Sequence, residues 1–197
     1  MSAPRIYLAG PEVFLPNPGS VAEAKRKLCE SHGFTGVSPL DNEIDLSRLS
    51  KREAALRIST ANEETIRGCQ LLIANLTPFR GPSADVGTAY EMGFARALGL
   101  PVFGYTNCGG SLLERMRRQP DNRVSVLASG RVEDSYHMAI EDFDLSDNLM
   151  LECAILGSGS KVIVSPTSVE RRYTDLAGFE ACLRRAAKQV SVVHFEA

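Results

Sequence analysis

The stretch Ile6-Tyr7-Leu8-Ala9-Gly10-Pro11 decides the fold, because four consecutive apolar or aromatic residues end at a glycine and a proline. A short run of this kind is typical of a strand that is buried on both faces of a parallel sheet. Apolar residues then recur at helical spacing from Ser20 to Gly33, and residues 34–37 follow as a second strand. The amino-terminal segment therefore predicts a strand, a helix and a second, parallel strand.

The same alternation continues along the chain. Further helices are predicted at residues 51–69, 86–98, 146–156 and 175–189, and further strands at residues 71–75, 101–105 and 161–164. Residues 107–144 are less regular and predict a short helix at 112–118 and a hairpin that turns at Ser129-Gly130. This order predicts an α/β fold with a doubly wound, five-stranded parallel sheet of the flavodoxin or Rossmann-like kind. We expect a single domain, residues 1–197, with its ligand site at the carboxyl ends of the strands.

Composition and charge argue against several classes of protein. The chain has 197 residues, of which 44% are hydrophobic and 23% charged, and its formal net charge is -2. This charge provides no basic field for nucleic acid. No apolar run approaches the roughly 20 residues of a membrane span, and the first ten residues lack the regions of a secretion signal. We therefore expect a cytoplasmic protein that binds neither nucleic acid nor membranes.

Cysteines and histidines give no support to a metal site. Neither type of residue shows a metal-ligand spacing: the cysteines are Cys29, Cys69, Cys108, Cys153 and Cys182, and the histidines are His32, His137 and His194. Glycine-rich motifs for dinucleotides or triphosphates are also absent from the sequence. We expect free thiols, no metal and no cofactor.

One acidic residue occupies a helix face that is otherwise apolar. On a helix of 3.6 residues per turn, Gly87, Phe94, Ala95 and Leu98 fall within about 60° of Glu91. This places the Glu91 carboxylate in the middle of the stripe expected to pack on the sheet. Burying an unpaired carboxylate is costly, so the site must offer hydrogen-bond donors, a cation or a water-filled pocket. The alternative is a glutamate that leans outward or caps a neighbouring loop.

Three other polar residues could serve the same site. Asn62 lies on an apolar helix face, Tyr7 lies inside the first strand, and Asp85 precedes the helix of Glu91. Each also has an ordinary explanation, as a core amide bonded to the backbone, a core tyrosine and a helix N-cap. Gly87 removes a side chain where a ligand could approach the backbone.

Four segments, taken in order, resemble the nucleoside 2-deoxyribosyltransferase family. They are Ile6–Phe14, Ala74–Gly81, Asp85–Gly93 and Asp147–Met150, and the resemblance covers most of the chain from residue 5 to 156. It implies that Glu91 is the nucleophile, that Tyr7 hydrogen-bonds it and that Asp85 meets the nucleobase.

The resemblance also implies the reaction and its partners. A 2′-deoxynucleoside and a free nucleobase would exchange 2-deoxyribose through a covalent deoxyribosyl-glutamate, with retention at C1′, in nucleoside salvage. The expected substrate-binding residues are Gly10, Phe14, Asn62, Gly87 and Asn148. Because Asn148 matches an asparagine that reaches a neighbouring subunit's site, the resemblance implies a homo-oligomer.

Two alternatives stay open at this point. The first is a 2′-deoxynucleoside 5′-monophosphate N-glycosidase, in which water takes the sugar and in which Arg80, Ser83 and Ser111 could contribute to a phosphate site. The second is a non-catalytic nucleotide-sensing module, which would not need the charge of Glu91. The family pattern also varies at Asn62, where some members have an aspartate, and in the carboxyl-terminal segment, which is longer here than in the shorter members.

Overall fold

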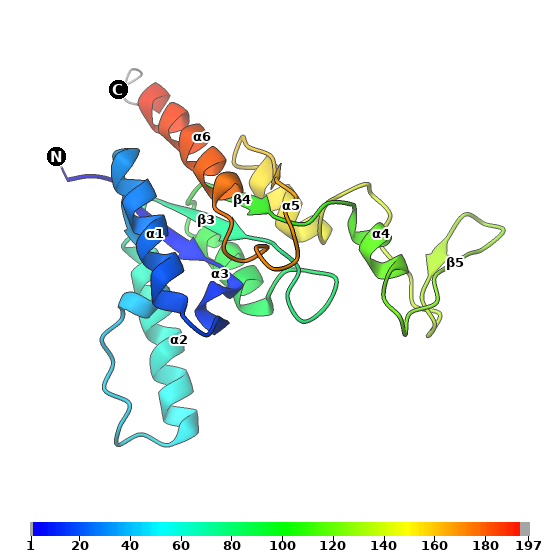
Figure 1. Ribbon diagram of the computed structural model, residues 1–197, viewed down its shortest axis with the longest axis horizontal. Helices are drawn as coiled ribbons and strands as arrows, with labels where there is room; N and C mark the ends of the chain where they lie inside the picture. Colours follow the sequence, from blue (N-terminus) through cyan, green and yellow to red (C-terminus); the bar gives the residue numbers. More distant parts are fainter. Residues whose placement is uncertain (1, 194–197) are drawn as a thin grey trace.

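A five-stranded parallel sheet forms the centre of the computed structural model, which describes residues 2–193 (Figure 1). Its strands are β1 (Arg5–Ala9), β2 (Thr35–Val37), β3 (Leu71–Asn75), β4 (Val102–Thr106) and β7 (Ile163–Val164), and their order is β2-β1-β3-β4-β7. All four ladders are parallel, and Tyr7 of β1 lies opposite Val37 and Leu72. The predicted doubly wound sheet is confirmed, and its order reverses at β1, where such folds place a ligand crevice.

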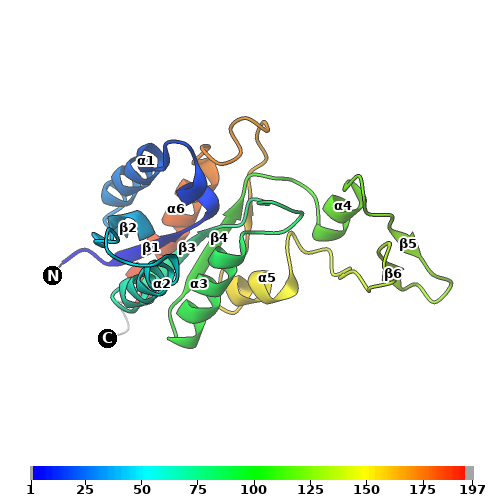
Figure 2. The same ribbon diagram turned by 90° about the horizontal axis from the view of Figure 1, so that it is seen from below.

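Helices cover both faces of this sheet (Figure 2). One face carries α1 (Pro18–Ser31) and α6 (Ala177–Val193), and the other carries α2 (Lys51–Arg67), α3 (Val86–Ala97) and α5 (Leu149–Leu156). Successive residues of β1 alternate between the two cores, because side chains of a strand point to opposite faces: Ile6 and Leu8 pack towards α1 and α6, while Tyr7 and Ala9 pack towards the other layer. Within residues 2–193, no helix has the length and apolar character needed to cross a membrane.

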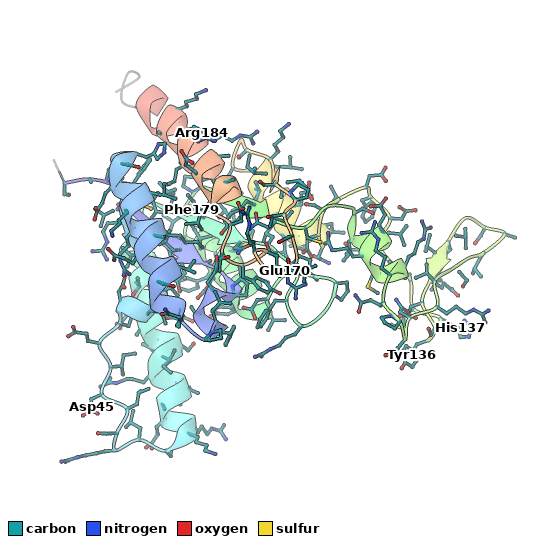
Figure 3. The ribbon with its side chains drawn as sticks, viewed as in Figure 1. Asp45, Tyr136, His137, Glu170, Phe179 and Arg184 are labelled. Atoms are coloured by element: carbon teal, nitrogen blue, oxygen red, sulfur yellow. The ribbon has the colours of Figure 1, made fainter. Side chains whose placement is uncertain are left out.

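A long excursion between β4 and α5 extends away from the sheet (Figures 1 and 2). This arm, residues 110–147, contains α4 (Leu112–Arg117) and the antiparallel strands β5 (Ser125–Val126) and β6 (Val132–Glu133). The predicted hairpin is confirmed, since Gly130 adopts a φ of 84° and its amide donates to the Leu127 carbonyl. Figure 3 places Tyr136 and His137 on the arm, far from the sheet, and Asp45 in the loop beside α2.

Two further short helices shape the carboxyl edge of the sheet. They are η1 (Pro11–Phe14), which directly follows β1, and η2 (Pro39–Asp41), which follows β2. Helix α5 begins at Leu149 rather than at the predicted residue 146, because Asn148 caps it by accepting a hydrogen bond from the Met150 amide.

The packing face of α3 is rotated from the predicted one and shares Ala95 with it. Thr88, Met92 and Ala95 are buried, whereas Gly87 is exposed and Glu91 is half-buried. At about 100° per residue, these three buried side chains lie roughly 40–100° to one side of Glu91, so Glu91 lies at the edge of the packing face and the prediction that it occupies the middle is wrong. The sheet therefore contacts uncharged side chains of α3, which need no ion solvation. The Glu91 carboxylate lies at the boundary of this contact.

Candidate active site

A cavity of about 430 Å³ lies beside the carboxyl end of β1. Its walls come from the segment after β1, from the segment that follows β2, from α2 and from the start of α3. The lining residues are Gly10, Val13, Phe14, Pro39, Leu40, Asn42, Ile44, Leu46, Ile58, Asn62, Asp85, Gly87, Thr88 and Glu91. Six of the predicted site residues therefore share one cavity: Gly10, Phe14, Asn62, Asp85, Gly87 and Glu91.

Tyr7 does not line the cavity, but it contacts Glu91, which does. Its side chain is fully buried in β1, and its hydroxyl donates a 2.5 Å hydrogen bond to Oε1 of Glu91. Burial raises the pKa of Glu91 to about 7; the Tyr7 hydrogen bond opposes this shift and the nearby Asp85 charge adds to it. Burial and the Glu91 charge also raise the pKa of Tyr7, so its phenol remains a donor.

Asp85 caps α3 and still faces the cavity. Its Oδ2 accepts hydrogen bonds from the amide of Thr88 at 3.0 Å and from the Thr88 hydroxyl at 3.3 Å. Among the described residues, none donates a hydrogen bond to Oδ1, which leaves this oxygen available to a ligand. A Cβ on Gly87 would lie 3.0 Å from Asp85 Oδ2, so the glycine leaves room for the carboxylate.

Phe14 stands at the exposed rim of the cavity. Its ring stacks on Phe79 at a centroid distance of 5.2 Å, and the Arg80 guanidinium lies 5.0 Å from the Phe14 centroid. The other two residues considered for a phosphate site are engaged elsewhere. Ser83 donates to Asp147, and Ser111 caps α4 by accepting a hydrogen bond from the Glu114 amide.

The two asparagines of the cavity form part of a hydrogen-bonded chain that links the loop after η2 to α2. Nδ2 of Asn42 donates a hydrogen bond to Oδ1 of Asn62 at 3.0 Å, and Oγ1 of Thr65 donates to Oδ1 of Asn42 at 2.9 Å. Asn62 was predicted from its place on an apolar helix face. Asn42 comes from the irregular loop after β2, where the sequence offers no periodic pattern that could have found it.

A second buried network supports the segment that follows β1, and no sequence pattern pointed to it. Glu12 accepts hydrogen bonds from Lys25 at 2.5 Å, from Asn75 at 2.8 Å and from Tyr105 at 3.1 Å. A Cβ on Gly10 would lie 1.9 Å from the Glu12 carboxylate, so this network requires the glycine. One feature of the sequence could have revealed this network: Lys25 is a charged residue on the same buried face of α1 as Val21.

Asn148 is the one predicted site residue that neither lines the cavity nor contacts Glu91 in the described part of the chain. Its side chain caps α5 and donates to Glu141 at 2.7 Å. Residues 2–193 contain no group of three histidine, cysteine or acidic residues that could hold a metal ion, and their five cysteines are free.

Comparisons with known proteins agree with this geometry. The family described as nucleoside 2-deoxyribosyltransferase matches residues 6–150. An uncharacterized protein of Schizosaccharomyces pombe is 30% identical over 171 residues, which are 82% of this chain and 81% of that protein. The structure of a 2-desoxiribosyltransferase from Leishmania mexicana is 30% identical, with a TM-score of 0.61 over 86% of this chain and 94% of that one. A conserved protein from Enterococcus faecalis V583 shares the fold at 18% identity, with a TM-score of 0.53 over 94% of this chain and 99% of that one.

Proposed function

Because this chain belongs to the nucleoside 2-deoxyribosyltransferase family, we propose that it moves 2-deoxyribose from a 2′-deoxynucleoside to a free nucleobase. The observation that carries the proposal is the partly buried Tyr7–Glu91 hydrogen bond at the wall of a cavity of about 430 Å³. Sites for small molecules usually have volumes of about 300–1,000 Å³, so a nucleoside has room beside the carboxylate. We place this activity in nucleoside salvage in the cytoplasm.

In the first step, a Glu91 oxygen attacks C1′ of the bound nucleoside. The new bond joins that oxygen to C1′, the C1′–N bond breaks, and its electron pair leaves with the base nitrogen, which takes up a proton. Tyr7 holds Oε1 and so fixes the rotamer from which the carboxylate attacks. The absence of a 2′-hydroxyl on the sugar eases the development of positive charge at C1′.

In the second step, an incoming base occupies the place that the first base has left. Its ring nitrogen attacks C1′ and loses its proton, while the ester bond to Glu91 breaks and returns the carboxylate. Two displacements at the same carbon give net retention. Asp85 presents its unengaged Oδ1 to the edge of the base and helps to transfer the proton at the ring nitrogen.

The charges around the cavity favour a substrate without a phosphate. Asp85 and Glu91 are the charged residues of the described cavity lining, and no cation is among them. A 5′-phosphate would meet these carboxylates in a partly dehydrated site, which is unfavourable. One observation favours the nucleotide N-glycosidase instead: Arg80, a cation, lies over the ring of Phe14 at the rim of the cavity.

A product assay separates these activities. The protein is incubated with a 2′-deoxynucleoside, or with its 5′-monophosphate, in the presence and absence of a second base. Transfer predicts a new nucleoside that forms only when the acceptor base is present. Base release from the monophosphate at a rate independent of the acceptor would instead identify a hydrolase.

The proposal also includes a homo-oligomer, because of the position of Asn148. Since Asn148 lies outside the cavity of its own chain, we place it at the site of a neighbouring copy, where it would meet the deoxyribose. Mixed oligomers of inactive Glu91→Ala and Asn148→Ala chains should regain activity, because some sites receive both native residues. Failure to regain activity in a verified mixed oligomer would contradict the shared site.

A further inference from the structure

Asp147 lies just before α5, but its side chain bonds to the segment that leads into α3. The carboxylate accepts hydrogen bonds from the hydroxyl of Ser83 and from the amide of Ala84, the latter at 3.0 Å. Ala84 is buried, so its amide depends on this acceptor. The next residue is Asp85, which caps α3 and lines the cavity. A side chain outside the cavity therefore holds the backbone that carries Asp85.

Arg115 of α4 completes this attachment. Its Nε donates to the carbonyl of Pro82 at 2.7 Å, on the same segment before α3. Its other two nitrogens donate to the carbonyls of Gly110 and Ser146, at the two ends of the arm. Nη2 also lies 3.6 Å from Oδ2 of Asp147, and both side chains of this ion pair are buried. Arg115 thus joins the base of the arm to the segment before α3 and supplies the charge that Asp147 needs.

Both oxygens of the Asp147 carboxylate are in use. Oδ1 accepts from the hydroxyl of Ser83 and from the amide of Asn148 at 2.7 Å, while Oδ2 accepts from the amide of Ala84. An asparagine would keep one oxygen and replace the other with an amino group. In either orientation, that amino group would meet the backbone N–H of Ala84 or of Asn148, and two donors would face each other. The contacts therefore require two acceptor oxygens, which a carboxylate has and a side-chain amide lacks.

We propose that Asp147, supported by Arg115, is a positioning residue that sets the place of Asp85 beside the nucleobase. Thr88 binds Oδ2 of Asp85, but the backbone of Asp85 follows the segment that Asp147 holds. A displacement of about 1 Å at a reacting group can cost about 10²-fold in rate, so this attachment matters for the reaction. The inference rests on the proposed function, because it concerns the work of Asp85 in the same cavity.

A double-mutant cycle on kcat/KM for transfer tests whether Asp147 acts through Asp85. Asp147→Asn should lower kcat/KM by about tenfold or more in the wild-type background. In an Asp85→Ala background the loss should be less than about threefold, because the group that Asp147 positions is gone. A residue that only supports the fold would cause the same loss in both backgrounds, and that outcome would overturn the inference. A wild-type loss of less than about threefold would also overturn it.

Two further variants make the cycle specific. Glu152→Gln is the matched control: Glu152 accepts bonds from the amide and hydroxyl of Ser146 at 2.7 Å, and in the described part of the chain it has no hydrogen bond to residues 82–84. Its effect on kcat/KM should be equal in the two backgrounds. Ser83→Ala removes one donor to Asp147 and replaces Asp147→Asn in the cycle if that variant does not fold. Its loss of about two- to fivefold should likewise disappear with Asp85→Ala, and a loss that persists would contradict the inference.

Amide hydrogen exchange gives a measurement that does not depend on turnover. Asp147→Asn should speed exchange at residues 84–88 by about tenfold, while residues 92–97, later on α3, keep their rates. Unchanged exchange at residues 84–88, or faster exchange along the whole helix, would overturn the inference. A wild-type chain that neither transfers the sugar nor releases the base would overturn the proposed function, and the exchange rates would still decide whether Asp147 holds the start of α3.

Discussion

Glu12 and Glu91 both place a carboxylate inside the protein near the carboxyl end of β1, but their partners differ. Glu12 is paired with the buried ammonium of Lys25 and accepts two further hydrogen bonds, from Asn75 and Tyr105. Among the described residues, the one hydrogen-bond donor to Glu91 is Tyr7, and the rest of the Glu91 carboxylate faces a cavity. Within the described residues, the carboxylate thus has a cation and three donors at one position, and a single neutral donor at the other.

This difference separates a structural role, for Glu12, from a catalytic role, for Glu91. Three donors bind Oε1 of Glu12, and one of them is the ammonium of Lys25, so the charge of this carboxylate is neutralised and the carboxylate holds η1 in place. Glu91 faces the cavity with Tyr7 as its one described donor and no described cation beside it, and burial raises its pKa to about 7. Functional sites often depart in this way from the full pairing of buried polar groups found elsewhere in a protein.

The largest expected effect is on turnover. Glu91→Gln keeps the shape of the side chain but removes the nucleophile, so transfer should fall by about 10⁴-fold or more while the circular dichroism spectrum is unchanged. Glu12→Gln is the matched control and should reduce turnover of the folded protein by less than about tenfold. Equal losses in the two variants would contradict the separation of roles.

The largest effect on stability is expected at Lys25. Lys25→Met leaves the Glu12 carboxylate buried without its cation, which should lower the free energy of unfolding by about 3–5 kcal/mol in urea titrations. The double variant with Glu12→Gln should be more stable than Lys25→Met alone, because the uncompensated charge is gone. If Lys25→Met costs less than about 1 kcal/mol, the pair does not hold this region as described.

Tyr7 should affect both rate and pH dependence. Below a pH of about 7, protonation of Glu91 should reduce kcat/KM, because the neutral acid is a poor nucleophile. Tyr7→Phe removes one hydrogen bond to the carboxylate and should lower kcat/KM by about 10–100-fold. Because this bond lowers the pKa of Glu91, its loss should also move the acidic limb to higher pH. A limb that stays in place or moves to lower pH would mean that Tyr7 does not stabilise the charged form.

The smallest effect is the pH dependence of stability that Glu91 confers. Its pKa is higher in the folded chain than the ordinary 4.5, so the folded state binds more protons than the unfolded state between pH 4.5 and about 7. The contribution of Glu91 to stability therefore falls as pH rises through this window. Glu91→Gln should gain about 1–2 kcal/mol relative to the wild type between pH 4 and pH 8, after allowance for water in the cavity. A stability difference that is independent of pH would contradict the raised pKa.

Much of the fold could be predicted from the sequence, because strand and helix patterns depend on neighbouring residues. The apolar run of β1 and the break at Gly10 located the first strand, and the later alternation predicted the parallel sheet. The exact face of α3 could not be predicted in this way, since Glu91 and Met92 are equally compatible with a helix. Contact with the sheet buried Met92 and turned Glu91 to the boundary.

The sequence by itself determined which residue types were available at the site, including an acid on an apolar helix and a tyrosine in the first strand. Only the tertiary structure decided that Tyr7 donates a hydrogen bond to Glu91, 84 positions away. It also decided that Glu12 is neutralised by Lys25 and bonded to Tyr105, 93 positions away. Local periodicity carries no information about such pairs, because their distances are set by how the strands and helices pack. The same packing brings Asn42 and Thr65 to Asn62.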